Sequence, residues 1–363
     1  MNTYAVIMAG GAGERFWPLS RMHKPKQLLR LTSTSQTMIE EAIERIAPLV
    51  PKERVLIITS EVLRDAIAQA LPSLPPENII AEPAKRNTAP CLALAAAVIR
   101  QRDSDALMAV LAADHFIGDA DAFRADVAKA LAYAESNDAL VTMGIPPTRP
   151  ETGYGYIQIL RETRNEDKHA VHRVEQFREK PSQELAREFL ASGNYLWNSG
   201  MFFWRVSMLE AAMKLTLPDV GNAIGVLAPD ALATTADITR ARAVFASLPD
   251  ISIDFGVMER AKNVAVVPAS FPWDDVGSWD SLDRMQKHDS FDNVVQGNVE
   301  MIDTAGSIIC NANARPHIVA TLGLDDIVVV ATDDATLVCS KDRAQDVKAI
   351  VTALRGKGLT DVL

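Results

Sequence analysis

Three glycines, Arg15 and Lys26 lie close together near the start of the sequence, in the segment MAGGAGERFWPLSRMHKPKQLL. Because a short apolar stretch precedes them, Gly10, Gly11 and Gly13 would form a tight turn after a strand and turn backbone N–H groups toward an anion. The guanidinium of Arg15 suits phosphate oxygens, and Lys26 adds a second positive charge. These residue types in this order indicate a phosphate-binding loop, against the alternative of a plain tight turn with surface cations.

Two better-known glycine-rich loops do not fit this segment. A dinucleotide-binding fingerprint that begins at Gly11 would need a glycine at position 16, where the sequence has Phe16. A P-loop would need lysine directly after Gly13, which is followed by Glu14. The loop therefore argues against an NAD-binding oxidoreductase and against a P-loop nucleotidase.

Carboxylates in two distant segments could hold a metal ion. Asp114 follows the buried strand predicted in AVLAADH, at the carboxyl edge where open α/β sheets bind ligands. Asp275 lies in WDDVGSW, beside a rival candidate, Asp274. Two converging carboxylates suit Mg²⁺, which keeps several waters and binds substrate phosphates. The alternative is that the acids only cap helices or form turns.

The elements that would position these residues alternate along the first half of the chain. Apolar or β-rich stretches predict strands at residues 4–9, 54–60, 78–83, 106–114 and 139–145. Amphipathic or capped stretches predict helices at residues 37–50, 87–102 and 121–135. This alternation is typical of a doubly wound, mainly parallel mixed sheet, a Rossmann-like α/β fold.

The pattern changes after about residue 146. Gly- and Pro-punctuated stretches predict antiparallel strands added to the sheet, followed by helices near 182–192 and 206–217. From about residue 292, short strands broken by Gly, Asn and Asp lead to a closing helix near 342–355. We therefore expect a catalytic domain over 1–288 and a small β-helix-like, all-β domain over 289–363.

Composition limits the partners. The 363 residues carry 37 basic and 47 acidic side chains, a net charge of −10, which disfavours nucleic acid or an anionic membrane as the main partner. The stretch between Arg86 and Arg100 is too short to span a bilayer. Three scattered cysteines without CxxC spacing predict reduced thiols in a cytoplasmic protein and no zinc site.

The loop segment, taken with five further motifs in the same order, resembles the sugar-1-phosphate nucleotidylyltransferase family, and its FWPLS…PKQ form is most similar to the mannose-1-phosphate guanylyltransferases. The further motifs are EPAKRNTAP, LAADH, RPETGYGYI, FREKP with WNSGMF, and SFPWDDVGSWDSL. The resemblance covers roughly residues 3–285 and implies GTP and mannose 1-phosphate as substrates, GDP-mannose for polysaccharide biosynthesis and pyrophosphate as products, and Mg²⁺ as cofactor.

The resemblance also implies roles for individual residues. It assigns catalysis to Arg15 and Lys26, and the metal to Asp114 and Asp275. The residues implied for the nucleotide are Gly10, Gly11, Gly13, Glu82, Arg86, Asn87 and Thr88. Those implied for the sugar phosphate are Gly153, Gly155, Glu179, Lys180, Asn198 and Asp254. The motif around Asp254 departs from the usual family form at Phe255, Gly256 and Arg260.

Two other functions stay open at this point. One is the same fold acting on another pair, such as UTP or dTTP with glucose 1-phosphate. The other is a non-catalytic homologue that binds GDP-mannose and regulates a partner subunit. The all-β C-terminal segment is a natural dimerisation element, so a homodimer is also expected.

Overall fold

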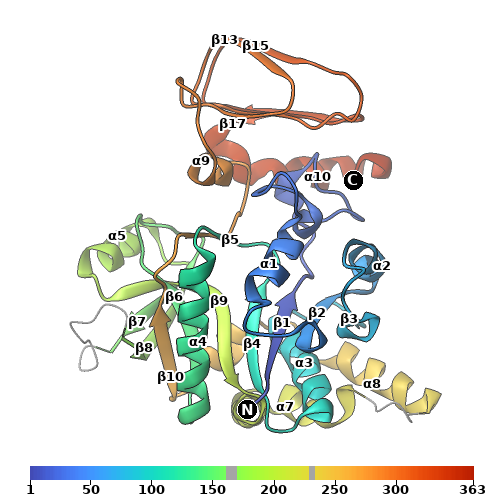
Figure 1. The fold of residues 1–363 in the computed structure, drawn as a ribbon, viewed down its shortest axis with the longest axis vertical. Coiled ribbons are helices and arrows are strands. Elements are labelled where there is room, and N and C mark those ends of the chain that lie inside the picture. The colour runs from blue at the N-terminus through green and yellow to red at the C-terminus, as the bar shows by residue number, and fades with distance from the viewer. Residues whose placement is uncertain (161–169, 229–233) are drawn as a thin grey trace. The chain divides into compact units, whose positions relative to one another are not determined.

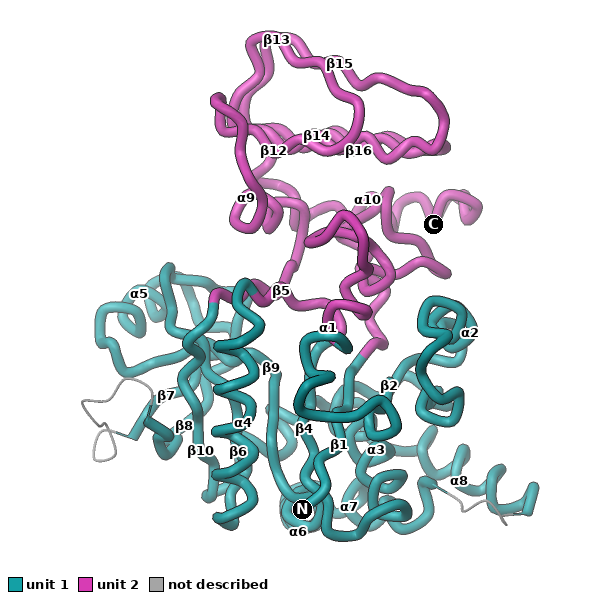
Figure 2. The backbone as a smooth tube through the Cα atoms, in the orientation of Figure 1, with its two compact units in different colours: residues 1–8, 43–112, 118–271 teal, residues 9–42, 113–117, 272–363 magenta. Residues whose placement is uncertain are grey.

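The computed structural model describes residues 1–160, 170–228 and 234–363, and these fold into two compact units (Figure 2). Unit 1 contains residues 1–8, 43–112 and 118–271. Unit 2 contains residues 9–42, 113–117 and 272–363. The segments of unit 2 that come from the first half of the chain therefore fold together with its C-terminal part.

Unit 1 is built on a nine-stranded sheet of order β3-β2-β1-β4-β9-β6-β10-β8-β7. Its first four neighbours are parallel: β3 (Ile79–Glu82), β2 (Val55–Ser60), β1 (Thr3–Met8) and β4 (Leu107–Ala112). Helices α2 (Glu61–Ala70) and α3 (Thr88–Arg102) connect them. The strands are apolar almost throughout because the sheet is covered on both faces (Figure 1).

The rest of this sheet is mixed. Strand β9 (Tyr195–Arg205) runs antiparallel between β4 and β6 (Leu140–Ile145), and β10 (Val264–Pro268) is parallel to β6. Strands β7 (Gly155–Ile159) and β8 (His172–Glu179) pair antiparallel and lie at one edge of the sheet, next to β10. The expected mixed α/β sheet with added antiparallel strands is confirmed.

The remaining helices of unit 1 pack on this sheet or on the helices that cover it. They are α4 (Ala120–Ser136), α5 (Gln183–Ser192), α6 (Val206–Thr216), α7 (Pro218–Leu227) and α8 (Thr235–Ser247). The largest core joins α3, α6 and α7 to one face of the sheet, and the indole of Trp204 is fully buried in it. Helix α3 is apolar on nearly every side because it lies between the sheet and α7.

Unit 2 contains the C-terminal strands. Strands β12 (Val294–Gln296), β14 (Ile308–Asn311) and β16 (Ile327–Ala331) are parallel neighbours, and β17 (Thr336–Ser340) runs antiparallel to β16. A second parallel pair joins β13 (Val299–Ala305) and β15 (Val319–Asp325). Successive strands thus stack as coils, which confirms the expected β-helix-like segment. Helix α10 (Val347–Gly356) comes after them.

The core of unit 2 also takes side chains from the glycine-rich segment. Phe16 and Trp17 are buried in one cluster with Trp279, Val328 and Leu337. The ring centroids of Phe16 and Trp279 lie 5.1 Å apart. Helix α1 (Met38–Ile46) has residues in each of the two units, and α9 (Ser281–Met285) lies before the C-terminal strands. Among the described residues, the helices are too short or too polar to cross a membrane.

A glycine in the centre of the sheet offers a test of its packing. A Cβ added to Gly144 in β6 would lie 2.6 Å from Cδ1 of Leu196 and 2.8 Å from Cγ2 of Val266. Gly144→Ala should therefore lower the free energy of unfolding by about 1–3 kcal/mol through overpacking. Urea denaturation measures this change.

The matched control is Gly225→Ala in α7, where the nearest heavy atom is 3.9 Å from the added Cβ. Alanine has the higher helix propensity, so this variant should gain up to about 1 kcal/mol. Equal effects of the two substitutions would contradict the packing described for β6.

Candidate active site

The glycine-rich loop is held against Lys26 in unit 2. Gly13 has a φ of +63°, and a Cβ there would lie 2.3 Å from the Cβ of Lys26 and 2.9 Å from its backbone nitrogen. Both the left-handed conformation and the close approach require glycine at this position. The next residues form a short 3-10 helix, η1 (Glu14–Phe16), whose aromatic side chain enters the core. The burial of Phe16 thus anchors the end of the loop.

Lys26 joins the two predicted metal-binding segments. Its side chain is buried, and its Nζ lies 2.8 Å from Oδ2 of Asp114 and donates a hydrogen bond of 2.8 Å to the carbonyl oxygen of Asp275. Strands β5 (Phe116–Ile117) and β11 (Trp273–Asp274) pair antiparallel, with Asp274 opposite Phe116. This register brings the residues just before β5 beside those just after β11, although they are far apart in sequence.

The Asp114 carboxyl is ionised in this setting. Its burial opposes the charged form, but the charges of Lys26 and His115 and the hydrogen bonds to the carboxylate together hold the pKa of Asp114 below its usual value. The side chain is 32% exposed, so it remains open to solvent on one side. An ionised, partly open carboxylate next to a fixed ammonium is suited to phosphate and divalent-cation chemistry.

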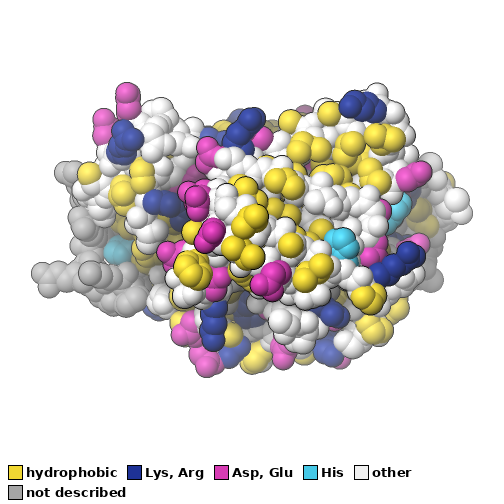
Figure 3. Space-filling model, turned by 90° about the horizontal axis from the view of Figure 1, so that it is seen from above, with side chains coloured by type: hydrophobic (Ala, Val, Ile, Leu, Met, Phe, Trp, Pro, Cys, Tyr) yellow, Lys and Arg dark blue, Asp and Glu magenta, His cyan; other side chains and the backbone are white. Residues whose placement is uncertain are grey.

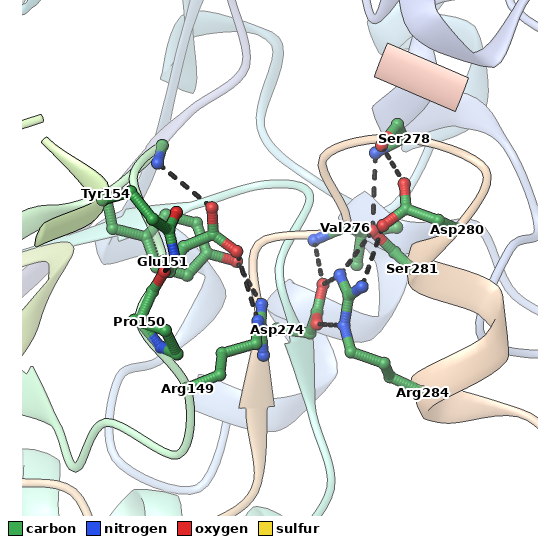
Figure 4. Close-up of polar contacts among 12 residues, drawn as sticks. Arg149, Pro150, Glu151, Tyr154, Asp274, Val276, Ser278, Asp280, Ser281 and Arg284 are labelled. Atoms are coloured by element: carbon green, nitrogen blue, oxygen red, sulfur yellow. Dashed lines mark hydrogen bonds and ion pairs between the residues drawn. The ribbon is translucent and has the colours of Figure 1, made fainter. Parts of the chain in front are cut away.

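Asp274 has a different environment from its neighbour Asp275. Its carboxylate is buried, accepts the N–H of Val276 at 2.8 Å, and pairs with Nε of Arg284 at 2.6 Å (Figure 4). Arg284 also contacts Asp280 at 2.9 Å. Both oxygens of Asp274 are therefore engaged in holding the WDDVGSW turn. The Asp275 carboxylate instead lies over Gly277, where an added Cβ would be 3.1 Å from Oδ2.

The other loop residues are exposed. Gly10 and Gly11 lie at the surface, and a Cβ at Gly11 would meet no heavy atom within 4 Å. Arg15 is exposed too, and within the part of the chain that the structure describes its guanidinium has no hydrogen-bonding or ionic partner. The loop backbone and this cation are accessible to an anion.

The residues predicted for the base lie in unit 1, where β3 ends and α3 begins. Asn87 is the N-cap of α3, with a φ of +65°, and its side chain accepts the N–H of Thr88 at 2.9 Å. The hydroxyl oxygen of Thr88 accepts the N–H of Ile253 at 2.8 Å. Glu82 contacts the thiol of Cys91 on α3, and burial raises the pKa of Glu82 to about 7.

Arg86 is directed elsewhere. Its Nε donates to the carbonyl oxygen of Ala246 at 3.0 Å, near the end of α8, and its Nη1 donates to the carbonyl of Lys85 at 3.0 Å. The guanidinium thus satisfies a carbonyl group of the C-terminal turn of a helix. The predicted nucleotide contact of Arg86 stays a prediction.

Four of the predicted sugar residues come together in unit 1. A Cβ at Gly155 would lie 2.3 Å from Oε2 of Glu179, its cross-strand partner, and 3.4 Å from the Cβ of Asn198. The Asn198 amide donates to Oδ1 of Asp254 at 2.7 Å. Burial raises the pKa of Glu179 and of Asp254, and the charge of Asp254 raises that of Glu179 further. Lys180 is exposed beside them, with a φ of +45°.

The loop before β7 contains two organising residues that the sequence analysis did not select. The Glu151 carboxylate accepts the N–H of Gly153 at 3.1 Å and pairs with Nε of Arg149 at 3.2 Å (Figure 4). The Arg149 guanidinium lies 5.0 Å from the Trp197 ring centroid and 5.9 Å from that of Tyr154. The opposite charges two residues apart in RPETGYGYI were the available signal.

Comparison with known proteins agrees with this fold and these motifs. Residues 4–290 match the family described as Nucleotidyl transferase, and residues 297–354 match the MannoseP isomerase/GMP-like beta-helix domain. Mannose-1-phosphate guanylyltransferase of Escherichia coli K12 is 42% identical over 98% of this chain and 74% of its own length. Alginate biosynthesis protein AlgA of Pseudomonas aeruginosa is 39% identical over 98% of this chain and 73% of its own.

A solved structure from Thermus thermophilus, described as a mannose-1-phosphate geranyltransferase, is 38% identical, with a TM-score of 0.86 over 98% of this chain and 100% of that one. The chain therefore belongs to the nucleotidyl transferase family, and it is an enzyme of that class. Within the family its relatives include the mannose-1-phosphate guanylyltransferases, so the expected resemblance to that group is confirmed.

The environment of Glu82 predicts a pH effect on stability. Its pKa rises from an ordinary 4.5 to about 7 on folding, so its ionisation favours the unfolded chain, and this cost appears as the pH rises from 4.5 through about 7. Relative to the wild type, Glu82→Gln should gain about 2–3 kcal/mol more in free energy of unfolding at pH 8 than at pH 5. Urea denaturation at the two pH values measures this difference. The exposed Glu77→Gln is the control, and parallel pH curves for wild type and Glu82→Gln would contradict the burial of this carboxyl.

Proposed function

We propose that the chain transfers GMP from GTP to α-D-mannose 1-phosphate, giving GDP-mannose and pyrophosphate. The observation that carries the proposal is the joint placement of Lys26, Asp114 and Asp275 beside a glycine-rich loop with an accessible Arg15. The named relatives, at 42% and 39% identity over nearly the whole chain, support the choice of substrates.

The reaction needs positioning and charge stabilisation more than proton transfer. An oxygen of the sugar phosphate attacks the α-phosphorus of GTP in line, a new P–O bond forms, and the bond to the bridging oxygen of the departing pyrophosphate breaks. The nucleophile is already an anion, so neither a general base nor a covalent enzyme intermediate is required. We assign the transferring phosphoryl group to Lys26, the pyrophosphate to the loop N–H groups and Arg15, and the sugar phosphate to Lys180.

The donor set of Asp114 and Asp275 fits Mg²⁺. Asp114 is ionised and partly open, and both residues belong to the paired segments around β5 and β11. When bound, the ion would neutralise phosphate charge and reduce the repulsion between two anionic substrates. Lys26 limits the negative charge at these carboxylates, because its ammonium already pairs with one oxygen of Asp114.

The acidic cluster of unit 1 supports a polyhydroxyl ligand. Glu179 and Asp254 are half-buried, their pKa values are raised, and the Asn198 amide donates to Asp254. Hydroxyl groups of a hexose would supply further donors to these carboxylates.

For the base we assign Glu82 as acceptor of the guanine N1–H and N2–H₂ groups, with Asn87 and Thr88 beside it. Such polar recognition rejects a mismatched base strongly.

We also propose that the protein forms a homodimer through its C-terminal strands. Ile302 on β13 and Leu322 on β15 are cross-strand neighbours that are 56% and 70% exposed. Figure 3 shows hydrophobic side chains gathered on the face that it draws. Surfaces of this kind mark interaction sites.

The unpaired state of Cys91, Cys310 and Cys339 supports a cytoplasmic location.

Pyrophosphate release from the purified protein tests the proposal. With Mg²⁺ and mannose 1-phosphate, we expect release with GTP and rates lower by at least about 10²-fold with ATP, UTP or dTTP. Release with a pyrimidine nucleotide and glucose 1-phosphate would keep the reaction class but refute the base assignment at Glu82. Binding of GDP-mannose without any turnover would instead favour a regulatory homologue.

Neighbouring aspartates provide a matched pair of variants for the metal assignment. Asp275→Asn should lower kcat/KM by at least about 10²-fold and shift the dependence on Mg²⁺ concentration. Asp274→Asn should lower the free energy of unfolding by about 3 kcal/mol, because it weakens the buried pair with Arg284. Steady-state kinetics over a Mg²⁺ titration, together with urea denaturation, separate the two effects. The reverse pattern would move the metal ligand to Asp274.

A further inference from the structure

Helix α10 contacts the 3-10 helix η1 that ends the glycine-rich loop, and both belong to unit 2. Nη2 of Arg355, in the last turn of α10, lies 2.8 Å from Oε1 of Glu14. The two side chains are 51% and 24% exposed. Glu14 directly precedes Arg15 in the chain, so this ion pair lies between the loop glycines and Arg15, the two groups assigned to pyrophosphate.

A second contact holds the other end of η1. The indole N–H of Trp17 donates to the carbonyl oxygen of Val362 at 2.7 Å, and Trp17 is 7% exposed. The carbonyl oxygen of Trp17 in turn accepts the indole N–H of Trp279 at 3.1 Å. The short helix is therefore fixed at both ends by groups from the C-terminal part of the chain, and the loop itself contributes neither partner.

The Arg355 ion pair also affects the charge around Arg15. Without a cation, the Glu14 carboxylate would be an acidic neighbour able to pair with Arg15 or to repel a phosphate anion. With Arg355 in place, Glu14 has a partner, and Arg15 is left accessible. The ion pair between Arg355 and Glu14 therefore affects both the position of Arg15 and its accessibility to an anion.

We propose that α10 and the segment after it position the glycine-rich loop for the triphosphate. In this role Arg355 and Trp17 are positioning residues: Arg355 acts through Glu14, and Trp17 acts through the chain around Val362. The inference rests on the proposed function for the assignment of Arg15 to pyrophosphate, and it adds the C-terminal helix to the groups that set affinity for the nucleotide. Small displacements of a positioned group have large kinetic effects, which makes the contact measurable.

Substitutions that remove or reverse the charges of the Arg355–Glu14 ion pair test the proposal through steady-state kinetics. Arg355→Ala should raise KM for GTP about 2–5-fold, the range expected of an exposed ion pair, and leave KM for mannose 1-phosphate unchanged. Arg355→Glu should raise KM for GTP more than Arg355→Ala does, because two carboxylates would then face each other. The double variant Glu14→Arg with Arg355→Glu should return KM to within about twofold of the wild type.

The matched control is Arg100→Ala, which removes a comparable pair with Glu210 at 3.1 Å between helices of unit 1. It should leave KM for GTP unchanged. Equal changes in both KM values for Arg355→Glu, or a double variant as impaired as Arg355→Glu, would overturn the inference.

Amide hydrogen exchange gives a readout that needs no turnover. In the substrate-free protein, Arg355→Glu and Trp17→Phe should speed exchange of the amides of residues 10–17 by about tenfold or more, with exchange across the nine-stranded sheet unchanged. Trp17→Phe keeps a buried ring and removes only the N–H donor. If pyrophosphate release failed with every nucleotide but this exchange response held, the proposed function would fall and the positioning would stand. If exchange at residues 10–17 stayed at the wild-type rate in both variants, the positioning inference would fall, whatever the activity.

Discussion

The ion pair between Lys26 and Asp114 is the interaction on which the arrangement of the glycine-rich loop and the two aspartate segments depends. A buried ammonium needs acceptors, and Lys26 obtains one from Asp114 and one from the carbonyl of Asp275. Gly13 has to be glycine because the loop passes directly over this lysine. The position of one side chain thus couples the loop, the residues before β5 and the turn after β11.

The two units differ in the charged side chains at their predicted site residues. Unit 2 contains the cations Arg15 and Lys26, which suit phosphate oxygens, together with two carboxylates suited to a divalent ion. Unit 1 contains two half-buried acids, Glu179 and Asp254, whose pKa values are raised by partial burial. Ionising such a carboxyl group costs free energy because the group is partly removed from water, and hydroxyl or N–H donors of a ligand would reduce that cost. A net charge of −10 is therefore compatible with a substrate that carries several phosphates.

Much of this could be predicted from the sequence, because the signals were local. Continuous apolar runs identified the strands around β1 and β4, and the spacing of Gly13, Arg15 and Lys26 identified the loop. The features that sequence analysis missed depend on contacts between distant segments. Nothing near Arg86 indicates that its guanidinium bonds to Ala246 on α8. Nothing in the sequence near Asp274 indicates that Arg284 pairs with its carboxylate, the contact that distinguishes its environment from that of Asp275. The grouping of residues 9–42 with the C-terminal strands likewise depends on side chains that meet only in the fold.

The shared core of Phe16, Trp279, Val328 and Val351 has a consequence for the order of folding. The ribosome makes the glycine-rich segment long before most of the side chains that surround Phe16, such as Trp279, Val328 and Val351. The parallel strands of unit 1 can begin to pair earlier, since β1 to β4 are complete within the first 112 residues. The nascent chain must therefore carry the glycine-rich segment, with its two large aromatic side chains, uncovered until residues 279–351 have been made. Contacts this distant in sequence form slowly and expose apolar surface meanwhile, so this segment is where a chaperone has the most to protect.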